Sequence, residues 1–331
     1  MKKRRITALL LALTMLALTA CSSGSGGGGS SSGNSDTTHR LAFGGNNSST
    51  SSYIISVAYG EIINTNVPGA SMTVEETGGG FEVITQLING ELDGCCASDA
   101  AAYDAINKTG QFADVDNSDN FYAWLPMYTS PVQAIVKADS PITCFSDFEG
   151  KRIGMDVVGT GSETIHTRMF EVFGMSDKIT AVNVSKAESM EMLKTGELDV
   201  AIITTAAPTT TIVEFGTTEK YRIIPFTAEE ISQMAGPGSY MIPTVLSAST
   251  YDQLTEDVST VCLYTNAYVG KNLDDELVYN MTKAVWEHQD RLISAHPSQE
   301  LLSPEMVKGV LQVNQYHPGA AKYYQEMGWI D

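Results

Sequence analysis

The sequence is poor in positive charge. Its 331 residues include 20 lysines and arginines against 39 aspartates and glutamates, so the formal net charge is −19. A surface this acidic repels nucleic acid and anionic lipid. We therefore expect no nucleic-acid partner and no membrane contact through the folded surface, and we expect a monomer.

Cysteine and histidine are also scarce. Cys95 and Cys96 are adjacent inside an apolar segment, whereas Cys144 and Cys262 are isolated. No pair has the spacing of zinc ligands, and the five histidines are scattered, so we expect no metal site. The sequence favours buried free thiols, with a disulfide as the open alternative.

Behind the N-terminus, no segment is long and apolar enough to span a membrane, which takes about 20 residues. The apolar run Ile6–Ala20 follows a basic start, and it predicts a signal peptide over residues 1–20. The run ends in Leu18–Cys21, which resembles a bacterial lipobox, so we expect a lipid on the thiol of Cys21. The alternative is an ordinary signal peptide with an accidental cysteine. Residues 21–38 are rich in glycine and serine and predict a flexible tether.

Motifs of nucleotide-dependent and hydrolytic enzymes are missing. The Gly-Lys pairs at 150–151 and 270–271 are not followed by the Ser or Thr that a Walker A motif needs. The stretch Gly159–Ser162 lacks the third glycine of a dinucleotide fingerprint, and no Gly-x-Ser-x-Gly elbow appears outside the glycine- and serine-rich residues 21–38. We therefore expect a binding protein rather than an enzyme, without a cofactor.

One pattern is present twice. Leu87–Asp93 and Leu193–Asp199 both indicate the end of a helix, a glycine stop and the entry to a strand, at Gly94–Ala97 and Val200–Ile203. An apolar strand, a loop of glycines or hydroxyls and a helix precede each copy. These segments are Leu41–Phe43, Gly44–Ser52 and Tyr53–Ile63 in the first copy, and Arg152–Val158, Gly159–Ser162 and Glu163–Phe173 in the second. The order predicts two similar α/β lobes with parallel strands.

The loops between strand and helix are the candidate ligand site. Ligands of open α/β sheets bind at the carboxyl ends of the strands, and helix N-termini present free N–H groups to anions. We expect the two loops to face each other across a cleft, with Ser162 as a helix cap. We interpret Gly161 as a close approach of the backbone to an anion, with a positive φ as one reason for glycine. The candidate residues of the two loops are Ser49, Thr50, Ser51, Ser52, Tyr53, Gly159, Thr160, Gly161 and Ser162.

Further candidates follow other strand ends. Asp99 either accepts an ammonium group of the ligand or caps the helix Ala100–Ile106, and Thr205 and Thr209 either contact the ligand or cap. Tyr103 and Tyr128 are candidate walls of the cleft. Arginine is absent from the loops, so backbone N–H groups and hydroxyls would hold a carboxylate.

From about Arg40 to Asp331 the chain resembles the TAXI-type solute-binding proteins of TRAP (tripartite ATP-independent periplasmic) transporters. The order of several short stretches carries this resemblance. They are Thr77-Gly78-Gly79, Ser98-Asp99 with Tyr103-Asp104-Ala105, Leu125-Pro126-Met127-Tyr128, Phe148–Ile153, Gly159–Glu163, Ala207-Pro208-Thr209 and Tyr316–Ala320. The first loop departs from the family, because Ser51–Ile55 replaces a Gly-Gly-Thr-Tyr-Tyr-Pro pattern. This departure leaves the ligand open.

The resemblance implies a type II periplasmic-binding-protein-like fold, with two α/β lobes joined by crossover strands and a ligand cleft between them. Lobe I would comprise 39–129 and 247–331, and lobe II 130–246. The implied function is an extracytoplasmic lipoprotein that delivers glutamate or a related dicarboxylate to a TRAP permease. Alternatives are a receptor for an ATP-driven importer of another anion and a sensor that docks a signalling protein. The resemblance adds Gly78, Gly79, Ser98 and Pro208 to the candidate ligand contacts.

Overall fold

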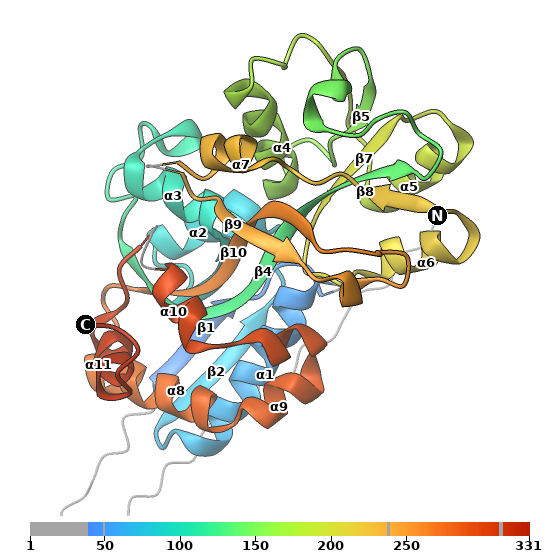
Figure 1. Ribbon diagram of the computed structural model, residues 1–331. Coiled ribbons are helices and arrows are strands. Elements are labelled where there is room, and N and C mark those ends of the chain that lie inside the picture. Colours follow the sequence, from blue (N-terminus) through green and yellow to red (C-terminus); the bar gives the residue numbers. More distant parts are fainter. Residues whose placement is uncertain (1–38, 49, 237–238, 311–313) are drawn as a thin grey trace, which may run out of the picture. The chain divides into compact units, whose positions relative to one another are not determined.

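A mixed sheet of ten strands runs through the described part of the chain in the computed structural model (Figure 1). Its order is β2-β1-β3-β10-β4-β7-β5-β6, with β8 paired to β4 and β9 to β10. The strands are β1 (His39–Gly44), β2 (Ala70–Glu75), β3 (Gly94–Ser98), β4 (Phe121–Lys137), β5 (Arg152–Gly154), β6 (Thr180–Val182), β7 (Val200–Thr204), β8 (Tyr221–Ile223), β9 (Ile242–Leu246) and β10 (Val258–Gly270).

The structure describes residues 39–48, 50–236, 239–310 and 314–331, which belong to one unit, Thr37–Asp331. The predicted signal peptide and tether, Cys21 and the candidate Ser49 lie outside the described residues. The helices are α1 (Ser51–Asn66), α2 (Gly80–Ile88), α3 (Asp99–Asn107), α4 (Gly161–Val172), α5 (Lys186–Thr195), α6 (Thr210–Thr218), α7 (Ala228–Met234), α8 (Asp275–Glu287), α9 (Gln289–Ala295), α10 (Pro304–Val310) and α11 (Pro318–Glu326). Short 3-10 turns are η1 (Gly110–Phe112), η2 (Phe145–Phe148), η3 (Ala248–Thr250) and η4 (Pro297–Leu301).

The two longest strands, β4 and β10, lie next to each other in the middle of the sheet order. One end of β4 pairs with β10 over Phe121–Pro131, and the other end pairs with β7 and β8 over Val132–Lys137. We call β1–β3 with α1–α3 and α8–α11 the first half, and β5–β8 with α4–α7 the second half. Figure 1 shows β4 passing from the first half to the second. The predicted lobe boundaries at 129/130 and 246/247 stay a prediction.

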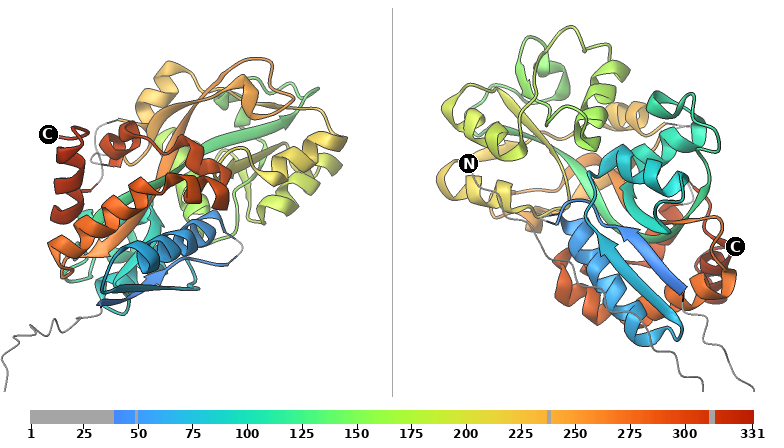
Figure 2. Two further views of the ribbon diagram at one scale, coloured as in Figure 1. Left: turned by 90° about the horizontal axis from the view of Figure 1, so that it is seen from below. Right: turned by 180° about the vertical axis from the view of Figure 1, so that it is seen from behind.

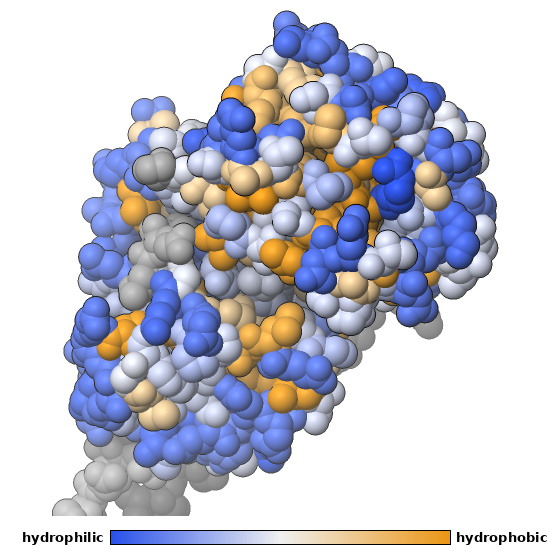
Figure 3. All heavy atoms as spheres, viewed as in Figure 1, coloured by the Kyte–Doolittle hydropathy of each residue, from blue (hydrophilic) through white to orange (hydrophobic). Residues whose placement is uncertain are grey.

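Each half has its own apolar core, because one face of each helix is buried against the sheet. In the first half Trp124 packs edge-on against Phe43 and Tyr59, and α1 lies against α8 and α9 (Figure 2). In the second half Phe145 stacks on Phe170. Hydrophilic residues cover much of the face shown in Figure 3, and no helix of the described residues is long and apolar enough to cross a membrane.

The repeated Gly-Glu-Leu-Asp pattern ties neighbouring strands together in both halves. The Oδ2 atom of Asp93 accepts the backbone N–H of Ala42 at 2.8 Å, and Oδ2 of Asp199 accepts that of Arg152 at 2.9 Å. The N–H of each aspartate returns to the carbonyl of the same residue. The sequence repeat is therefore a structural device that fixes β3 to β1 and β7 to β5.

The predicted segments are confirmed, with shifted ends. Both helices behind the loops begin two residues earlier than predicted, at Ser51 and Gly161. The strand predicted over 152–158 is wrong beyond Gly154, because Asp156 has a φ of 72°, which an extended strand cannot contain. The cysteines at 95, 96, 144 and 262 are free thiols, as favoured from the sequence.

Candidate functional site

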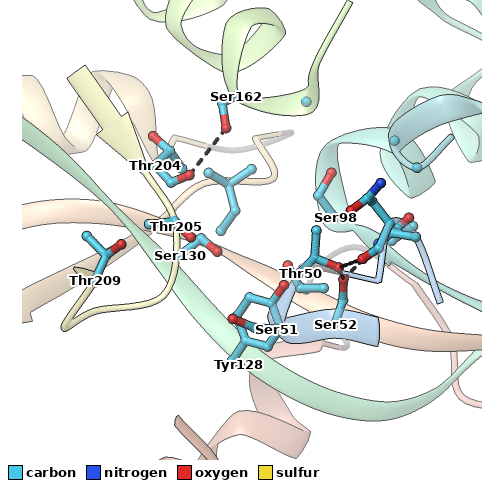
Figure 4. A pocket seen from close by; sticks show the side chains of 18 of the residues that line it. Thr50, Ser51, Ser52, Ser98, Tyr128, Ser130, Ser162, Thr204, Thr205 and Thr209 are labelled. Atoms are coloured by element: carbon cyan, nitrogen blue, oxygen red, sulfur yellow. Dashed lines mark hydrogen bonds between the residues drawn. The ribbon is translucent and has the colours of Figure 1, made fainter. Parts of the chain in front are cut away.

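A cleft of about 580 Å³ lies between the two halves. The start of α1 lines it from the first half, and the start of α4 lines it from the second. Residues of β4 and β10, including Tyr128, Ser130 and Thr265, also line it. The two predicted loops therefore face one cleft, as Figure 4 shows for Ser51 and Ser162.

In the first half, Thr50 caps α1. Its hydroxyl accepts the N–H of Tyr53 at 3.3 Å and donates to the carbonyl of Asn47 at 2.7 Å. Ser51 and Ser52 follow as the first helical residues, and both line the cleft. The first turn of α1 has no acidic residue, so nothing on the helix neutralises its positive end.

In the second half, Thr160 caps α4, and the predicted cap Ser162 is wrong. The hydroxyl of Thr160 accepts the N–H of Glu163 at 3.2 Å. Ser162 instead donates its hydroxyl to the carbonyl of Thr204, at 3.2 Å (Figure 4). The hydroxyl of Ser162 is bonded to Thr204 at the end of β7, and Ser162 is already inside α4. Thr160, the residue just before the helix, therefore supplies the cap.

Gly161 has no positive φ, so the conformational reason proposed for this glycine is wrong. The left-handed residue of the loop is Gly159. A Cβ atom on Gly161 would lie 3.5 Å from Oγ of Ser98, which is an ordinary contact across the cleft. A Cβ atom therefore fits at this position, and only a larger side chain would fill the space between α4 and Ser98.

Three more helices begin at the cleft. Gly79 precedes α2, Ser98 precedes α3 and Thr209 precedes α6. Each helix start carries free N–H groups and about half a positive charge. With α1 and α4, five helix N-termini therefore converge on one cleft.

No aspartate or glutamate is among the described residues that line the cleft, although the chain has 39. Lys186 contributes its ammonium group, which is paired with the buried carboxylate of Asp156. His296 also lines the cleft, and burial lowers the pKa of its imidazole. The lining is therefore free of negative side chains within a strongly acidic protein.

His166 lies behind the second-half wall and is fully buried. Its Nδ1 atom is 3.0 Å from the carbonyl oxygen of Met155, and its Nε2 atom is 2.8 Å from Oγ1 of Thr204. Burial lowers the pKa of this imidazole to about 4. His166 is therefore neutral at pH 7 and fixes the hydroxyl of Thr204, which lines the cleft.

Most of the predicted site residues lie in the cleft. Those that line it are Thr50, Ser51, Ser52, Gly78, Gly79, Ser98, Tyr128, Gly161, Ser162, Thr205 and Thr209. Burial raises the pKa of Tyr128 to about 12, so its phenol is neutral. The predicted residues outside the lining are Tyr53, Asp99, Tyr103, Gly159, Thr160 and Pro208.

Asp99 fulfils neither predicted role, because its side chain is turned toward β10. It is 1% exposed and accepts hydrogen bonds from Asn266 and, at 2.8 Å, from the hydroxyl of Tyr268. Burial raises the pKa of this carboxyl to about 8. The helix α3 begins at Asp99 without any side-chain cap.

Tyr103 and Gly159 lie outside the cleft lining. The ring of Tyr103 packs edge-on against Tyr240 at 5.5 Å, and the guanidinium of Arg168 lies over the same Tyr240 ring. Gly159 lines a neighbouring hollow of about 460 Å³ together with Gly78.

Several lining residues were missed from the sequence. Ser130 could have been found, because alternate residues of a strand share a face and Tyr128 was already a candidate. Thr204 is the last residue of β7, one position beyond the predicted strand. Lys186 and His296 gave no local signal, since only the tertiary fold brings them to the cleft.

Two α/β halves with a cleft at the helix N-termini define the class of periplasmic-binding-protein-like folds. The model of the NMT1-like family matches residues 43–328, so the chain belongs to the NMT1-like family. The comparisons do not support the TAXI type that the sequence suggested.

The fold is similar to that of a putative sulfonate ABC transporter's periplasmic sulfonate-binding protein, SsuA, from Methylobacillus flagellatus KT. The TM-score is 0.55 at 12% identity, over 88% of this chain and 96% of that chain. The periplasmic aliphatic sulphonate binding protein SsuA from Escherichia coli gives a TM-score of 0.48 at 11% identity, over 87% and 90% of the two chains. A putative L-cystine ABC transporter from Listeria monocytogenes gives 0.46 at 14%, over 80% and 96%. The first likeness confirms the predicted two-lobed fold.

Proposed function

We propose that the chain is a solute-binding protein that holds a small organic anion in its cleft, outside the cytoplasm, and delivers it to a membrane transporter. One observation carries this proposal. Five helix N-termini converge on a cleft whose described lining has no carboxylate. The arrangement favours negative charge and disfavours a cation.

The physical chemistry of the lining fits an anion with a short carbon skeleton. Hydrogen bonds to a charged acceptor contribute about 1.5–3 kcal/mol each, and the first turns of α1 and α4 supply N–H donors. Ser51, Ser98 and Thr205 add hydroxyls. Ile165 and Leu263 supply apolar contact for carbon atoms.

An ATP-driven importer is the better supported partner. The fold neighbour with the TM-score of 0.55 is described as part of a sulfonate ABC transporter, whereas the TRAP permease rests on the sequence resemblance alone. We therefore propose a carboxylate or sulfonate as ligand. Glutamate fits less well than a plain dicarboxylate, because its ammonium group would meet Lys186 and no carboxylate in the described lining.

We propose binding without chemical conversion and without a cofactor. Residues 1–20 and Cys21 would deliver the chain across the membrane and attach it by a lipid. Cys21→Ala should abolish labelling by palmitate and release the protein from the membrane fraction in high salt. Continued lipid labelling of this variant would contradict the anchor.

A panel of small molecules tests the proposed ligand class. Succinate, glutarate, ethanesulfonate and phosphate would be compared with glucose and putrescine by thermal unfolding. At 100 times its Kd a ligand adds about 2.7 kcal/mol, which raises the melting temperature by several degrees. At least one organic anion should do so. Stabilisation by glucose or putrescine alone would overturn the proposal.

Uptake by cells with and without the protein tests the transport role. Loss of uptake on deletion, with sensitivity to ATP depletion, is the expected result. Uptake that instead follows the ion gradient would restore the TRAP permease, and unchanged uptake would favour the sensor.

A further inference from the structure

We propose that Thr204 and Ser162 make the second-half wall of the cleft a hydrogen-bond acceptor, so that the ligand is an organic anion that also bears a hydroxyl group. This inference rests on the proposed function, since it concerns the same cleft. Its chemical class is a hydroxy acid or a hydroxysulfonate. The observation behind it is the fixed direction of three hydrogen bonds, two made by His166 and one between Ser162 and Thr204.

The first two bonds fix the proton on Thr204. The carbonyl of Met155 can only accept, so Nδ1 of His166, 3.0 Å away, must carry its proton. A neutral imidazole has one proton, which leaves Nε2 bare. The hydroxyl of Thr204, 2.8 Å away, must therefore donate to Nε2. Its oxygen is left with lone pairs only for any group in the cleft.

The imidazole is neutral because of its surroundings. His166 is fully buried, and neither ring nitrogen is bonded to a carboxylate. The charges that act on it are the carboxylate of Asp156 and the ammonium of Lys186, which oppose each other and form an ion pair. Desolvation therefore dominates and keeps the ring uncharged at neutral pH.

The third bond fixes the proton on Ser162. Its hydroxyl donates to the backbone carbonyl of Thr204 at 3.2 Å, so its oxygen also offers only lone pairs to the cleft. Figure 4 shows the two residues side by side at the cleft. Two neighbouring oxygens thus act as acceptors in the same wall, beside the N–H donors at the start of α4.

A neutral donor fits these acceptors better than an ammonium group. A buried ammonium needs a carboxylate partner, and none is among the described lining residues. Lys186 lines the same cleft and would repel it. A hydroxyl satisfies the acceptors without adding charge, while helix N-termini hold the anionic end of the ligand.

Two matched sets of ligands test the inference on the wild-type protein. Succinate, malate and aspartate differ only in hydrogen, hydroxyl or ammonium on one carbon. Ethanesulfonate, 2-hydroxyethanesulfonate and 2-aminoethanesulfonate form the second set. Calorimetric titration at pH 7 should show at least one set in which the hydroxylated member binds about tenfold or more tightly than both others. A tenfold difference in affinity is about what one additional hydrogen bond between neutral groups contributes.

Two variants then locate the effect. Thr204→Val keeps the shape and removes the hydroxyl, and it should lower the affinity for the hydroxylated ligand to that of the unsubstituted one. Thr204→Ser keeps the hydroxyl and should restore the preference. Circular dichroism and thermal unfolding check the fold, and the wild-type comparison decides the question even if the valine variant does not fold.

The outcomes separate this inference from the proposed function. If the hydroxylated member binds more tightly than both others in neither set, the inference is overturned and the proposed function stays intact. An equal loss for all members in Thr204→Val also overturns it. If none of the six compounds binds, the inference is overturned, whereas the proposed function fails only if the wider panel of anions also gives no stabilisation.

Discussion

The two halves of the cleft are alike at the surface and opposite behind it. Each presents the start of a threonine-capped helix, α1 or α4, to the cleft. Behind the first half lies Asp99, and behind the second lies His166, both buried. Burial raises the pKa of Asp99 to about 8 and lowers that of His166 to about 4, so both are uncharged at pH 7. Desolvation thus removes a negative charge on one side and a positive charge on the other.

This comparison shows what sets the charge of the cleft. With both buried groups neutral, the helix N-termini and Lys186 remain, and Asp156 offsets Lys186. The first turn of α4 contains Glu163, which accepts the N–H of Gly159 and so faces its own loop, whereas α1 has no acid there. The positive end of α1 is therefore the less compensated of the two.

The largest expected effect comes from adding a carboxylate to the start of α1 or of α4 in the cleft. Ser51→Asp and Ser162→Asp should each weaken anion binding by at least about a hundredfold, or about 2.7 kcal/mol, because each adds a negative charge to the cleft beside a helix start that should hold the anion. Ser51→Asp should fold, since an acid in the first turn favours a helix. Ser162→Asp also loses the hydrogen bond to the carbonyl of Thr204, so thermal unfolding checks its fold. Calorimetric titration measures the loss.

Thr227→Asp is the matched control for these variants. It adds the same charge at the cap of α7, outside the cleft lining, and should bind like the wild type. If Ser51→Asp binds like the wild type while Ser162→Asp does not, only the start of α4 holds the anion. The starts of α1 and α4 would then not be equivalent in binding.

A smaller effect is expected from filling the gap at Gly161. Gly161→Ala should be tolerated, because its Cβ would make only an ordinary contact with Ser98. Gly161→Val extends further into the cleft and should weaken binding about tenfold or more, about 1.4 kcal/mol. If the valine variant binds like the wild type, the ligand lies away from the start of α4.

The buried carboxyl gives a pH-dependent prediction. The pKa of Asp99 is about 8 in the fold against 3.8 as reference, so its stabilising contribution is present below pH 3.8 and is lost as the pH rises to about 8. Asp99→Asn cannot ionise. Its stability relative to the wild type should therefore increase across this window, by at least about 1.4 kcal/mol, the equivalent of one pKa unit.

Urea unfolding of Asp99→Asn and the wild type at pH 5 and pH 8 measures this difference. His166 has the opposite sign, because its lowered pKa makes the fold lose stability as the pH falls from 6.5 to about 4. A difference between Asp99→Asn and the wild type that does not change with pH would show that Asp99 is ionised in the fold.

The smallest expected effects concern the two caps. Thr50→Ala and Thr160→Ala each remove one side-chain bond to a backbone N–H and should cost about 1 kcal/mol of stability. Thermal unfolding compares them. Thr160→Ser should keep the cap, and Ser162→Ala should leave the bond between Thr160 and the N–H of Glu163 unaffected. A larger loss of stability in Ser162→Ala than in Thr160→Ala would show that Ser162 is the cap.

Local patterns in the sequence predicted the elements well. Apolar strands followed by hydroxyl-rich loops gave the starts of α1 and α4 to within two residues, and the repeated Gly-Glu-Leu-Asp pattern gave the entries to β3 and β7. These features depend on neighbours in the chain. The cap of α4 was missed because Thr160 and Ser162 both have a hydroxyl near the helix start, and the choice depends on Thr204, which is 42 residues from Ser162.

The roles of buried polar groups could not be predicted from local sequence. Asp99 has the position of a first-turn acid, but its partner Asn266 is 167 residues away. The direction of the hydroxyl of Thr204 depends on His166 and Met155, which no spacing rule connects. The cleft could therefore be located from the sequence, but its hydrogen-bond polarity could not.

The absence of carboxylates from the described lining has a kinetic consequence. The proposed ligand is an anion, yet the whole chain carries a formal charge of −19, so the chain as a whole repels the approaching ligand. Added salt screens this repulsion, with a Debye length of about 8 Å at physiological ionic strength. Association should therefore become faster as ionic strength rises, and in dilute buffer a singly charged anion should enter faster than a doubly charged one.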